Sequence, residues 1–136
     1  MPDPPSDVRD LIRSYFAACS AGDAEAVAAH FTQDATIYDT NHAPLQGREA
    51  IGKFWARIHE QWAGARWVLG AAVVEGDAAA IEWSMHGTHE NEPFVVRGSE
   101  HYSVESGLIA EIRQYWTFDP ASPGSELQDY DYTDTR

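Results

Sequence analysis

Residues 66–118 have the sequence RWVLGAAVVEGDAAAIEWSMHGTHENEPFVVRGSEHYSVESGLIAEIRQYWTF. Large apolar side chains alternate with small or polar ones through most of this stretch, and this period of two predicts β-strands with one buried face. We expect four strands, at about 66–75, 78–88, 94–104 and 108–118. The connections at Gly76-Asp77, at 89–93 and at Ser106-Gly107 are short enough for hairpin turns, so the strands should form an antiparallel meander.

The residues before position 66 follow a helical period instead. A first helix is expected to begin after Ser6, which would cap it, and to end at Gly22. Its buried stripe has the i, i+3, i+4 spacing of a helix and consists of Val8, Leu11, Ile12, Tyr15, Phe16 and Cys19. An alanine-rich helix at 24–31 and a third helix at about 48–61 should follow, with a β-prone segment at 35–39 between them. Helices first and hairpin-linked strands afterwards predict an α+β fold, in which the helices cover one face of a curved sheet.

The length and composition indicate a globular protein. The chain has 136 residues, the size of one domain, and 43% of them are hydrophobic, so we expect a single domain at 1–120. Residues 121–136 are acidic and have few apolar side chains, which predicts a loosely ordered tail. Leu127 and Tyr130 are the tail side chains expected to dock on a neighbouring surface.

The charge balance argues against several classes of partner. A formal net charge of −13 opposes binding to nucleic acids, which requires clustered Lys and Arg, and binding to anionic membrane surfaces. No apolar run approaches the roughly 20 residues that span a bilayer. The N-terminus lacks the basic start and apolar stretch of a secretory signal, so we expect a cytoplasmic protein.

The pattern of histidines and cysteines predicts no metal site. His86 and His89 are three residues apart on a predicted strand, so their side chains point to opposite faces and do not share a metal. Cys19 is the single cysteine, which excludes an intrachain disulfide, and its place among alanines of the first helix indicates a small buried side chain. We therefore expect no metal.

Five short motifs resemble one protein superfamily. They are YFAACSAGD at 15–23, FTQDAT at 31–36, LQGREAI at 45–51, GLI at 107–109 and RQYW at 113–116. They are similar to the nuclear-transport-factor-2-like (NTF2-like) superfamily, in its SnoaL-like polyketide cyclase and ketosteroid isomerase-like branch. The resemblance extends over about residues 7–118 and implies a cone-shaped fold, with three N-terminal helices packed on a curved, mainly antiparallel or mixed sheet.

The resemblance also implies a catalytic site. Tyr15, Asp39 and Glu100 fall at the positions of a tyrosine, a base and a second acid in ketosteroid isomerases. Asp39 would take a proton from a carbon next to a carbonyl group, while Tyr15 and a protonated Glu100 donate hydrogen bonds to the enolate oxygen. The implied activity is that of an isomerase, cyclase or dehydratase that acts without a cofactor on a small, hydrophobic, carbonyl-containing metabolite.

Five further residues are candidates for binding the substrate. They are Trp55, His86, Tyr102, Gln114 and Trp116. Trp55 and Trp116 match pocket-lining positions of the isomerase pattern and would favour a flat ligand. Tyr102 shares a strand face with Glu100, whereas His86 lies on a strand face that lines either the pocket or a subunit interface.

Other interpretations remain open from the residues alone. Glu100 would form an ordinary ion pair with Arg97 or Arg113, Asp39 would close an Asx-turn, and Tyr15 would be a core side chain. In that case the chain would be a non-catalytic module that binds a small molecule or supports the assembly of a larger complex.

We expect a homodimer, because an apolar convex sheet face needs covering and a second copy often covers it in this superfamily. Size-exclusion chromatography with light scattering should therefore give twice the mass of one chain. A monomer at every concentration would contradict this expectation.

Overall fold

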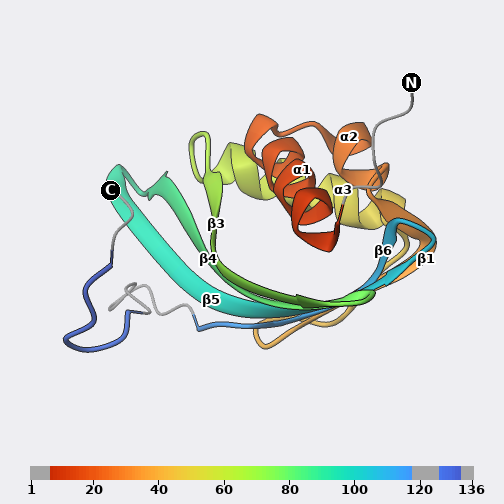
Figure 1. Cartoon of the computed structure of the whole chain (residues 1–136). Helices are drawn as coiled ribbons and strands as arrows, with labels where there is room; N and C mark the ends of the chain where they lie inside the picture. Colours follow the sequence, from red (N-terminus) through yellow and green to blue (C-terminus); the bar gives the residue numbers. More distant parts are fainter. Residues whose placement is uncertain (1–6, 118–125, 133–136) are drawn as a thin grey trace, which may run out of the picture.

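The computed structural model describes residues 7–117 and 126–132 and has three helices on one side of a curved, six-stranded sheet (Figure 1). In chain order the elements are α1 (Val8–Ala21), α2 (Ala24–Ala28), β1 (Phe31–Asp39), β2 (Leu45–Gln46), α3 (Arg48–Gln61), β3 (Arg66–Glu75), β4 (Ala78–His89), β5 (Glu92–Glu105) and β6 (Leu108–Tyr115). The α+β fold predicted from the sequence is confirmed, with the helices on the concave face.

The sheet has the strand order β2-β1-β6-β5-β4-β3. Strands β3 to β6 form the expected antiparallel meander, and β1 runs parallel to β6, so the sheet is mixed. The register places Asp39 of β1 opposite Gln114 of β6, and Gln114 opposite Glu100 of β5. Three polar side chains thus form one row across three neighbouring strands, which positions the site described below.

Two tight turns set the lengths of the last three strands. Glu90 and Asn91 both have positive φ angles, of 52° and 66°, as a two-residue type I′ hairpin turn requires. Strands β4 and β5 therefore extend further toward each other than predicted. Ser106 and Gly107, with φ angles of 51° and 80°, connect β5 to β6 in the same way.

The helix and strand ends differ from the prediction in several places, and β6 ends at Tyr115 rather than at residue 118. Helix α1 is capped by Asp7, whose side chain accepts a hydrogen bond from the Asp10 backbone N–H at 3.0 Å, and the expected cap Ser6 lies outside the described residues. Helix α2 ends at Ala28 rather than at residue 31, because Phe31 begins β1 and is completely buried. The short strand β2, at 45–46, is an addition to the prediction.

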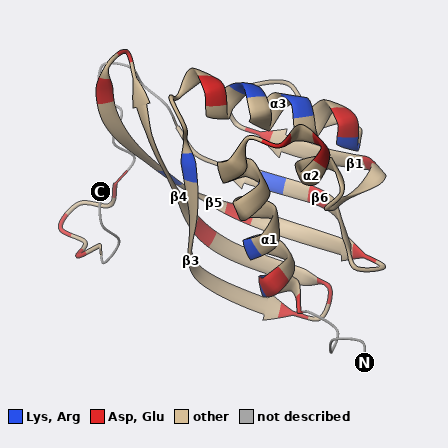
Figure 2. Ribbon diagram, turned by 90° about the horizontal axis from the view of Figure 1, so that it is seen from above, with Lys and Arg blue, Asp and Glu red and all other residues tan. Residues whose placement is uncertain are grey.

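The core lies between the helices and the concave face of the sheet (Figures 1 and 2). Its largest fully buried side chains come from both layers and are Ile12, Tyr15, Val27, Phe31, Ile37, Ile51, Val96, Tyr102, Ile109 and Ile112. Burial of each such apolar side chain stabilises the fold by roughly 1.5–3 kcal/mol relative to exposure. This packing joins the helices to the concave face of the sheet.

The convex face of the sheet carries both polar and apolar side chains: Val68, Val95 and Tyr115 lie opposite Ser84, His86 and Ser99 on neighbouring strands. Strand alternation assigns to it Glu82, Ser84 and His86 of β4, with Arg97 and Ser99 of β5. The homodimer stays a prediction.

Residues 126–132 lie against this convex face, on the side of the sheet away from the helices (Figure 1). The Arg97 guanidinium lies 3.7 Å from the centre of the Tyr132 ring, and its Nε is 3.5 Å from Glu126 Oε1. Leu127 and Tyr130, the expected docking residues, are each 58% exposed. The segment is therefore held mainly by Tyr132 and Glu126 rather than by its predicted apolar contacts.

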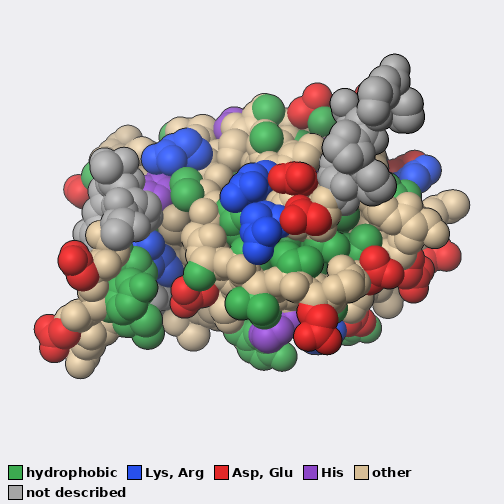
Figure 3. Space-filling model, viewed as in Figure 1, with side chains coloured by type: hydrophobic (Ala, Val, Ile, Leu, Met, Phe, Trp, Pro, Cys, Tyr) green, Lys and Arg blue, Asp and Glu red, His purple; other side chains and the backbone are tan. Residues whose placement is uncertain are grey.

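Charged side chains are distributed over the helices and the strand ends (Figure 2). On the face seen in Figure 1, basic side chains lie beside acidic ones and form no continuous basic area (Figure 3). Within residues 7–117 and 126–132, no helix is both long enough and apolar enough to cross a membrane.

Gly52→Ala should destabilise the protein, although alanine is the better helix former. A Cβ atom at residue 52 would lie 2.3 Å from the carbonyl oxygen of Ala24, a backbone atom, so α2 and α3 would have to separate. We expect a loss of about 1–3 kcal/mol in the free energy of unfolding, measured by urea denaturation. Lys53→Ala, at an exposed position of the same helix, is the control, and an unchanged Gly52→Ala variant would contradict the close packing.

Candidate functional site

A cavity lies between the concave face of the sheet and helices α1 and α3. All the tryptophans of the chain line it, namely Trp55, Trp62, Trp67, Trp83 and Trp116. Its polar groups come from Tyr15, Cys19, His42, Glu100 and Gln114. The free volume is about 50 Å³, enough for a few water molecules. The empty cavity is therefore narrow, aromatic and sparsely polar.

Strand alternation explains which side chains reach the cavity. Trp83 and Met85 of β4 point to the concave face, and Glu100 of β5 does the same. Gly98, two residues before Glu100, makes room for the indoles of this face, because a Cβ atom there would lie 2.6 Å from the Trp83 ring and 2.9 Å from Trp116 Cβ. Glycine at residue 98 thus allows two tryptophans to pack over β5.

Glu100 is a buried acid whose protonation state decides what the cavity can do. Its side chain is 4% exposed, and the Tyr102 hydroxyl donates a hydrogen bond to its Oε1 at 2.8 Å. Burial raises the pKa of the Glu100 carboxyl from 4.5 to about 8; the hydrogen bond from Tyr102 lowers it, and the charge of Asp39 raises it. Glu100 is therefore mainly protonated at neutral pH.

The alternative of an ion pair at Glu100 is wrong for the residues that the structure describes. Arg97 lies on the convex face and pairs with Glu126, and Arg113 pairs with Glu111 at 2.5 Å. Neither arginine reaches Glu100. The carboxyl group thus has no positive partner within the described chain.

Tyr15 lines the cavity from α1 and is 2% exposed. Burial raises the pKa of its hydroxyl well above 10, and electrostatic interactions with Cys19 and Glu100 raise it further. The hydroxyl therefore stays protonated and remains a hydrogen-bond donor. Cys19 is buried as expected, and burial raises the pKa of its thiol too.

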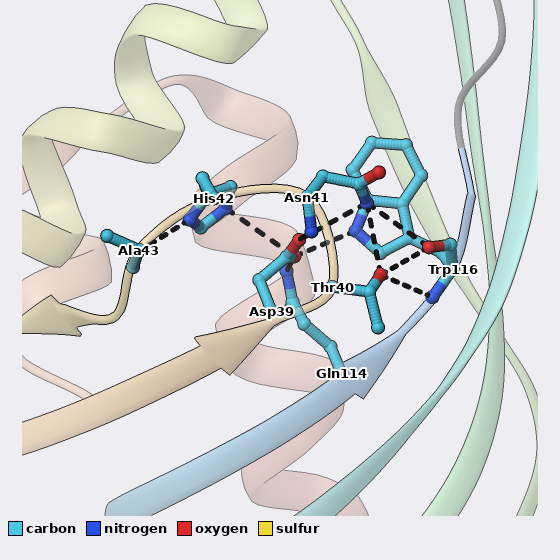
Figure 4. A network of polar contacts seen from close by, with 7 residues as sticks. All are labelled: Asp39, Thr40, Asn41, His42, Ala43, Gln114 and Trp116. Atoms are coloured by element: carbon cyan, nitrogen blue, oxygen red, sulfur yellow. Dashed lines mark hydrogen bonds and ion pairs between the residues drawn. The ribbon is translucent and has the colours of Figure 1, made fainter.

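Asp39 lies beside the cavity rather than among the residues that line it. Its carboxylate accepts hydrogen bonds from the Asn41 backbone N–H at 2.6 Å, from Trp116 Nε1 at 2.7 Å, and from the Gln114 amide (Figure 4). The Asn41 side-chain amide is a further donor, at 3.2 Å. A carboxylate has about four lone-pair sites, so all of them are occupied. Asp39 thus forms the Asx-turn and also orients two cavity residues, Gln114 and Trp116.

His42 joins the same network from the loop after β1 (Figure 4). Its Nδ1 is 2.9 Å from the Ala43 carbonyl oxygen, and its Nε2 is 3.5 Å from Asp39 Oδ2. Both ring nitrogens thus face oxygen atoms, one of the Ala43 backbone and one of Asp39. His42 is thereby turned so that its polar atoms interact with the loop and Asp39.

Among the predicted binding residues, Trp55, Gln114 and Trp116 line the cavity. Tyr102 is buried behind Glu100 and supports it through the hydrogen bond already described. His86 is on the convex face, with its Nε2 3.0 Å from Ser84 Oγ, and does not line the cavity. Of the two alternatives for the His86 face, the structure rules out the pocket, and the subunit interface stays a prediction.

The prediction missed several lining residues, among them His42, Trp62, Trp67, Trp83 and Met85. A usable signal was present for Trp83 and Met85, which share one face of a strand with Ile81. That face carries the larger apolar side chains and therefore turns toward the helices. The position of His42 depends on the path of the loop after Asp39, for which the sequence contains no comparable signal.

The chain is similar in sequence and in fold to known proteins. The model of the SnoaL-like domain family matches residues 12–112. A hypothetical protein with a ketosteroid isomerase-like fold from Catenulispora acidiphila DSM 44928, in complex with trimethylamine, has a TM-score of 0.74 and 22% identity, over 82% of this chain and 88% of that one. A putative polyketide cyclase from Sinorhizobium meliloti has a TM-score of 0.64 and 25% identity, over 77% and 93%.

An epoxide hydrolase/cyclase-like enzyme with a role in pyran ring formation in the polyether salinomycin has a TM-score of 0.71 and 19% identity, over 80% of this chain and 89% of that one. No protein with a curated description matches the chain. The structural likenesses confirm the NTF2-like fold that the sequence motifs implied. Since the family model matches residues 12–112 of the 136, the chain belongs to the family of SnoaL-like domains.

Proposed function

We propose that the protein is a cofactor-independent enzyme that moves a proton on a small, hydrophobic carbonyl compound, as an isomerase, cyclase or dehydratase. The observation that carries this proposal is Glu100, a carboxyl group that burial keeps protonated inside an aromatic cavity. A neutral carboxyl group donates a hydrogen bond to an oxygen that becomes negatively charged, which an ionised one cannot do. Membership of the SnoaL-like family supports the same class of chemistry.

In this proposal the substrate's carbonyl oxygen lies between Tyr15 and Glu100. The Tyr15 hydroxyl is one donor, and it stays protonated because burial raises its pKa. Glu100 is the other: Oε1 accepts from Tyr102, so Oε2 is left to carry the proton toward the oxygen. Hydrogen bonds in such a dry, apolar cavity stabilise developing charge more strongly than they do in water.

Asp39 is the proposed base. A substrate oxygen that accepts a hydrogen bond from the Gln114 amide would draw this amide away from Asp39 and free a lone pair of Oδ2. Oδ2 then takes a proton from the carbon next to the carbonyl group, and the electron pair of that C–H bond forms the enolate. Return of the proton at another carbon gives isomerisation, and loss of a leaving group gives elimination.

A non-catalytic module that binds small molecules is the second candidate. The full set of hydrogen bonds on Asp39 favours it, because a base needs a free lone pair. In that case the cavity would hold its ligand with an unchanged Asp39 network.

Proton exchange separates these candidates without knowledge of the product. Small hydrophobic ketones in D₂O should lose their α-protons faster with the protein present, as followed by proton NMR. Asp39→Asn should slow this exchange by about 100-fold or more, because it removes the base. Tyr15→Phe and Glu100→Gln should each slow it by roughly 10- to 1,000-fold, because each weakens stabilisation of the enolate oxygen.

The matched controls are Tyr38→Phe and Glu82→Gln, which alter an exposed tyrosine and an exposed acid outside the cavity. Both should exchange as the wild type does. If Asp39→Asn, Tyr15→Phe and Glu100→Gln all exchanged a ketone at the wild-type rate, the catalytic proposal would be abandoned in favour of the binding module.

The pH dependence of stability tests the state of Glu100 without a substrate. Its carboxyl titrates near pH 4.5 in the unfolded chain and near pH 8 in the folded protein. Between these values the folded state binds more protons than the unfolded state, so wild-type stability falls as the pH rises through this interval. Glu100→Gln does not ionise, so its stability relative to wild type should rise over the same interval, by at most roughly 5 kcal/mol.

Urea denaturation from about pH 4 to pH 9 measures this difference, which should be flat outside the interval. Glu82→Gln serves as the control and should show no such rise. A difference that falls with rising pH would mean that Glu100 is stabilised in its ionised form, and would remove the neutral donor from the mechanism.

A further inference from the structure

A proton on the Asp39 carboxyl would need a hydrogen-bond acceptor close to it. The hydrogen-bond partners of this carboxyl are the backbone and side-chain N–H groups of Asn41, the Gln114 amide and Trp116 Nε1 (Figure 4). Each of them is an N–H donor, and an N–H group cannot accept a hydrogen bond or a proton from a protonated carboxyl group. A proton that Asp39 takes from a substrate therefore finds no acceptor among these partners.

His42 supplies the acceptor that the other partners lack. Its Nε2 is 3.5 Å from Asp39 Oδ2, the oxygen proposed to take the proton, and its Nδ1 is 2.9 Å from the Ala43 carbonyl oxygen. Because a carbonyl oxygen only accepts, Nδ1 carries the hydrogen of the neutral imidazole and Nε2 carries the lone pair. Nε2 is buried without a hydrogen-bond partner among the described residues, as expected of a lone pair that faces a carboxylate.

The two side chains differ in their access to water. None of the Asp39 side chain is exposed, whereas 27% of the His42 side chain is. His42 also lines the cavity, where its ring lies 5.0 Å from the ring of Phe54, and it belongs to the loop between β1 and β2. The imidazole thus contacts the cavity, the buried carboxyl group and the surface of the protein.

We infer that His42 is a proton relay: it takes from Asp39 the proton that came from the substrate and exchanges it with water. The inference rests on the proposed function, in which Asp39 Oδ2 takes a proton from carbon. The O–H bond of protonated Asp39 breaks, the lone pair of His42 Nε2 forms the new N–H bond, and the carboxylate is restored beside an imidazolium. The imidazolium then loses a proton to water and returns to the neutral ring.

The relay is compatible with a neutral Glu100. The proton from the substrate is shared between Asp39 and His42, so this pair changes from one negative charge to no net charge. No net positive charge appears beside the Glu100 carboxyl, and its role as a hydrogen-bond donor is kept. A hydrogen bond from protonated Asp39 to Nε2 also stabilises the state in which the enolate exists.

Isomerisation of pent-4-en-2-one in D₂O tests the relay on the full chain. This compact ketone becomes pent-3-en-2-one when a proton leaves carbon 3 and a proton is added at carbon 5. NMR of the first product formed measures both the rate and the deuterium in the carbon-5 methyl group. Because a relay exchanges the proton with D₂O before it returns to carbon, more than about half of the wild-type product should contain deuterium there.

His42→Phe keeps an aromatic ring against Phe54 and removes the acceptor. It should slow isomerisation by about 10-fold or more and reduce the deuterium content to less than about one third of the wild-type value, because Asp39 returns the proton that it took. His42→Gln has an oxygen that accepts a hydrogen bond but carries no proton away, so it should restore part of the rate and none of the deuterium. His101→Phe, at a partly buried histidine outside the cavity, is the control and should match the wild type in both.

The deuterium content separates a relay from a structural role. A slower His42→Phe variant whose product contains as much deuterium as that of the wild type would overturn the inference and leave the proposed function intact. If His42→Phe fails to fold, the deuterium content with His42→Gln decides in the same way. A wild-type protein that neither isomerises this ketone nor exchanges the α-protons of any ketone would remove the proposed function, and the relay with it.

Nitrogen-15 NMR of histidine-labelled protein tests the relay without a substrate. At about pH 8, Nδ1 of His42 should be protonated and Nε2 unprotonated, with the signals assigned by their absence in His42→Gln. The opposite tautomer would leave no lone pair toward Asp39 and would also overturn the inference.

Discussion

The carboxyl group of Glu100 sits on the concave face of the sheet with a tyrosine hydroxyl as its hydrogen-bond partner and no cation beside it. A charge in such a place would be costly, so burial raises the pKa of this group to about 8 and it stays mainly neutral at neutral pH. The rest of the site is consistent with this constraint. Tyr15 and Tyr102 are uncharged donors, and the tryptophans keep the space around the carboxyl group apolar.

The row Asp39, Gln114 and Glu100 connects this neutral acid to a second carboxyl group across neighbouring strands. The Asp39 carboxyl accepts hydrogen bonds from several donors, whereas the Glu100 carboxyl accepts one, from Tyr102. One sheet therefore holds two carboxyl groups in different environments. Separation of two carboxyl groups into an acid and a base is how acid–base enzymes work at a single pH.

The fold was predictable because its signals are local. The period of two after residue 66 and the helical stripe of α1 depend on nearby residues, and short turns determine the meander. The inward direction of Glu100 followed from its apolar neighbours on β5. The face of β4 that meets the helices had a signal too, because Ile81, Trp83 and Met85 share it and are larger and more apolar than the residues of the other face. The donors on Asp39 come from Gln114 and Trp116, 75 and 77 residues further along the chain, so the sequence contained no sign that its lone pairs are occupied.

The central claim is that Glu100 is neutral in the folded protein at neutral pH. The most direct test is carbon-13 NMR of protein labelled at the side-chain carboxyl of glutamate, with the Glu100 signal assigned by its absence in Glu100→Gln. The chemical shift of this carboxyl should titrate with a midpoint near pH 8, the value that burial imposes. A midpoint at or below the ordinary value of 4.5 would show an ionised Glu100 and would contradict the account of the site.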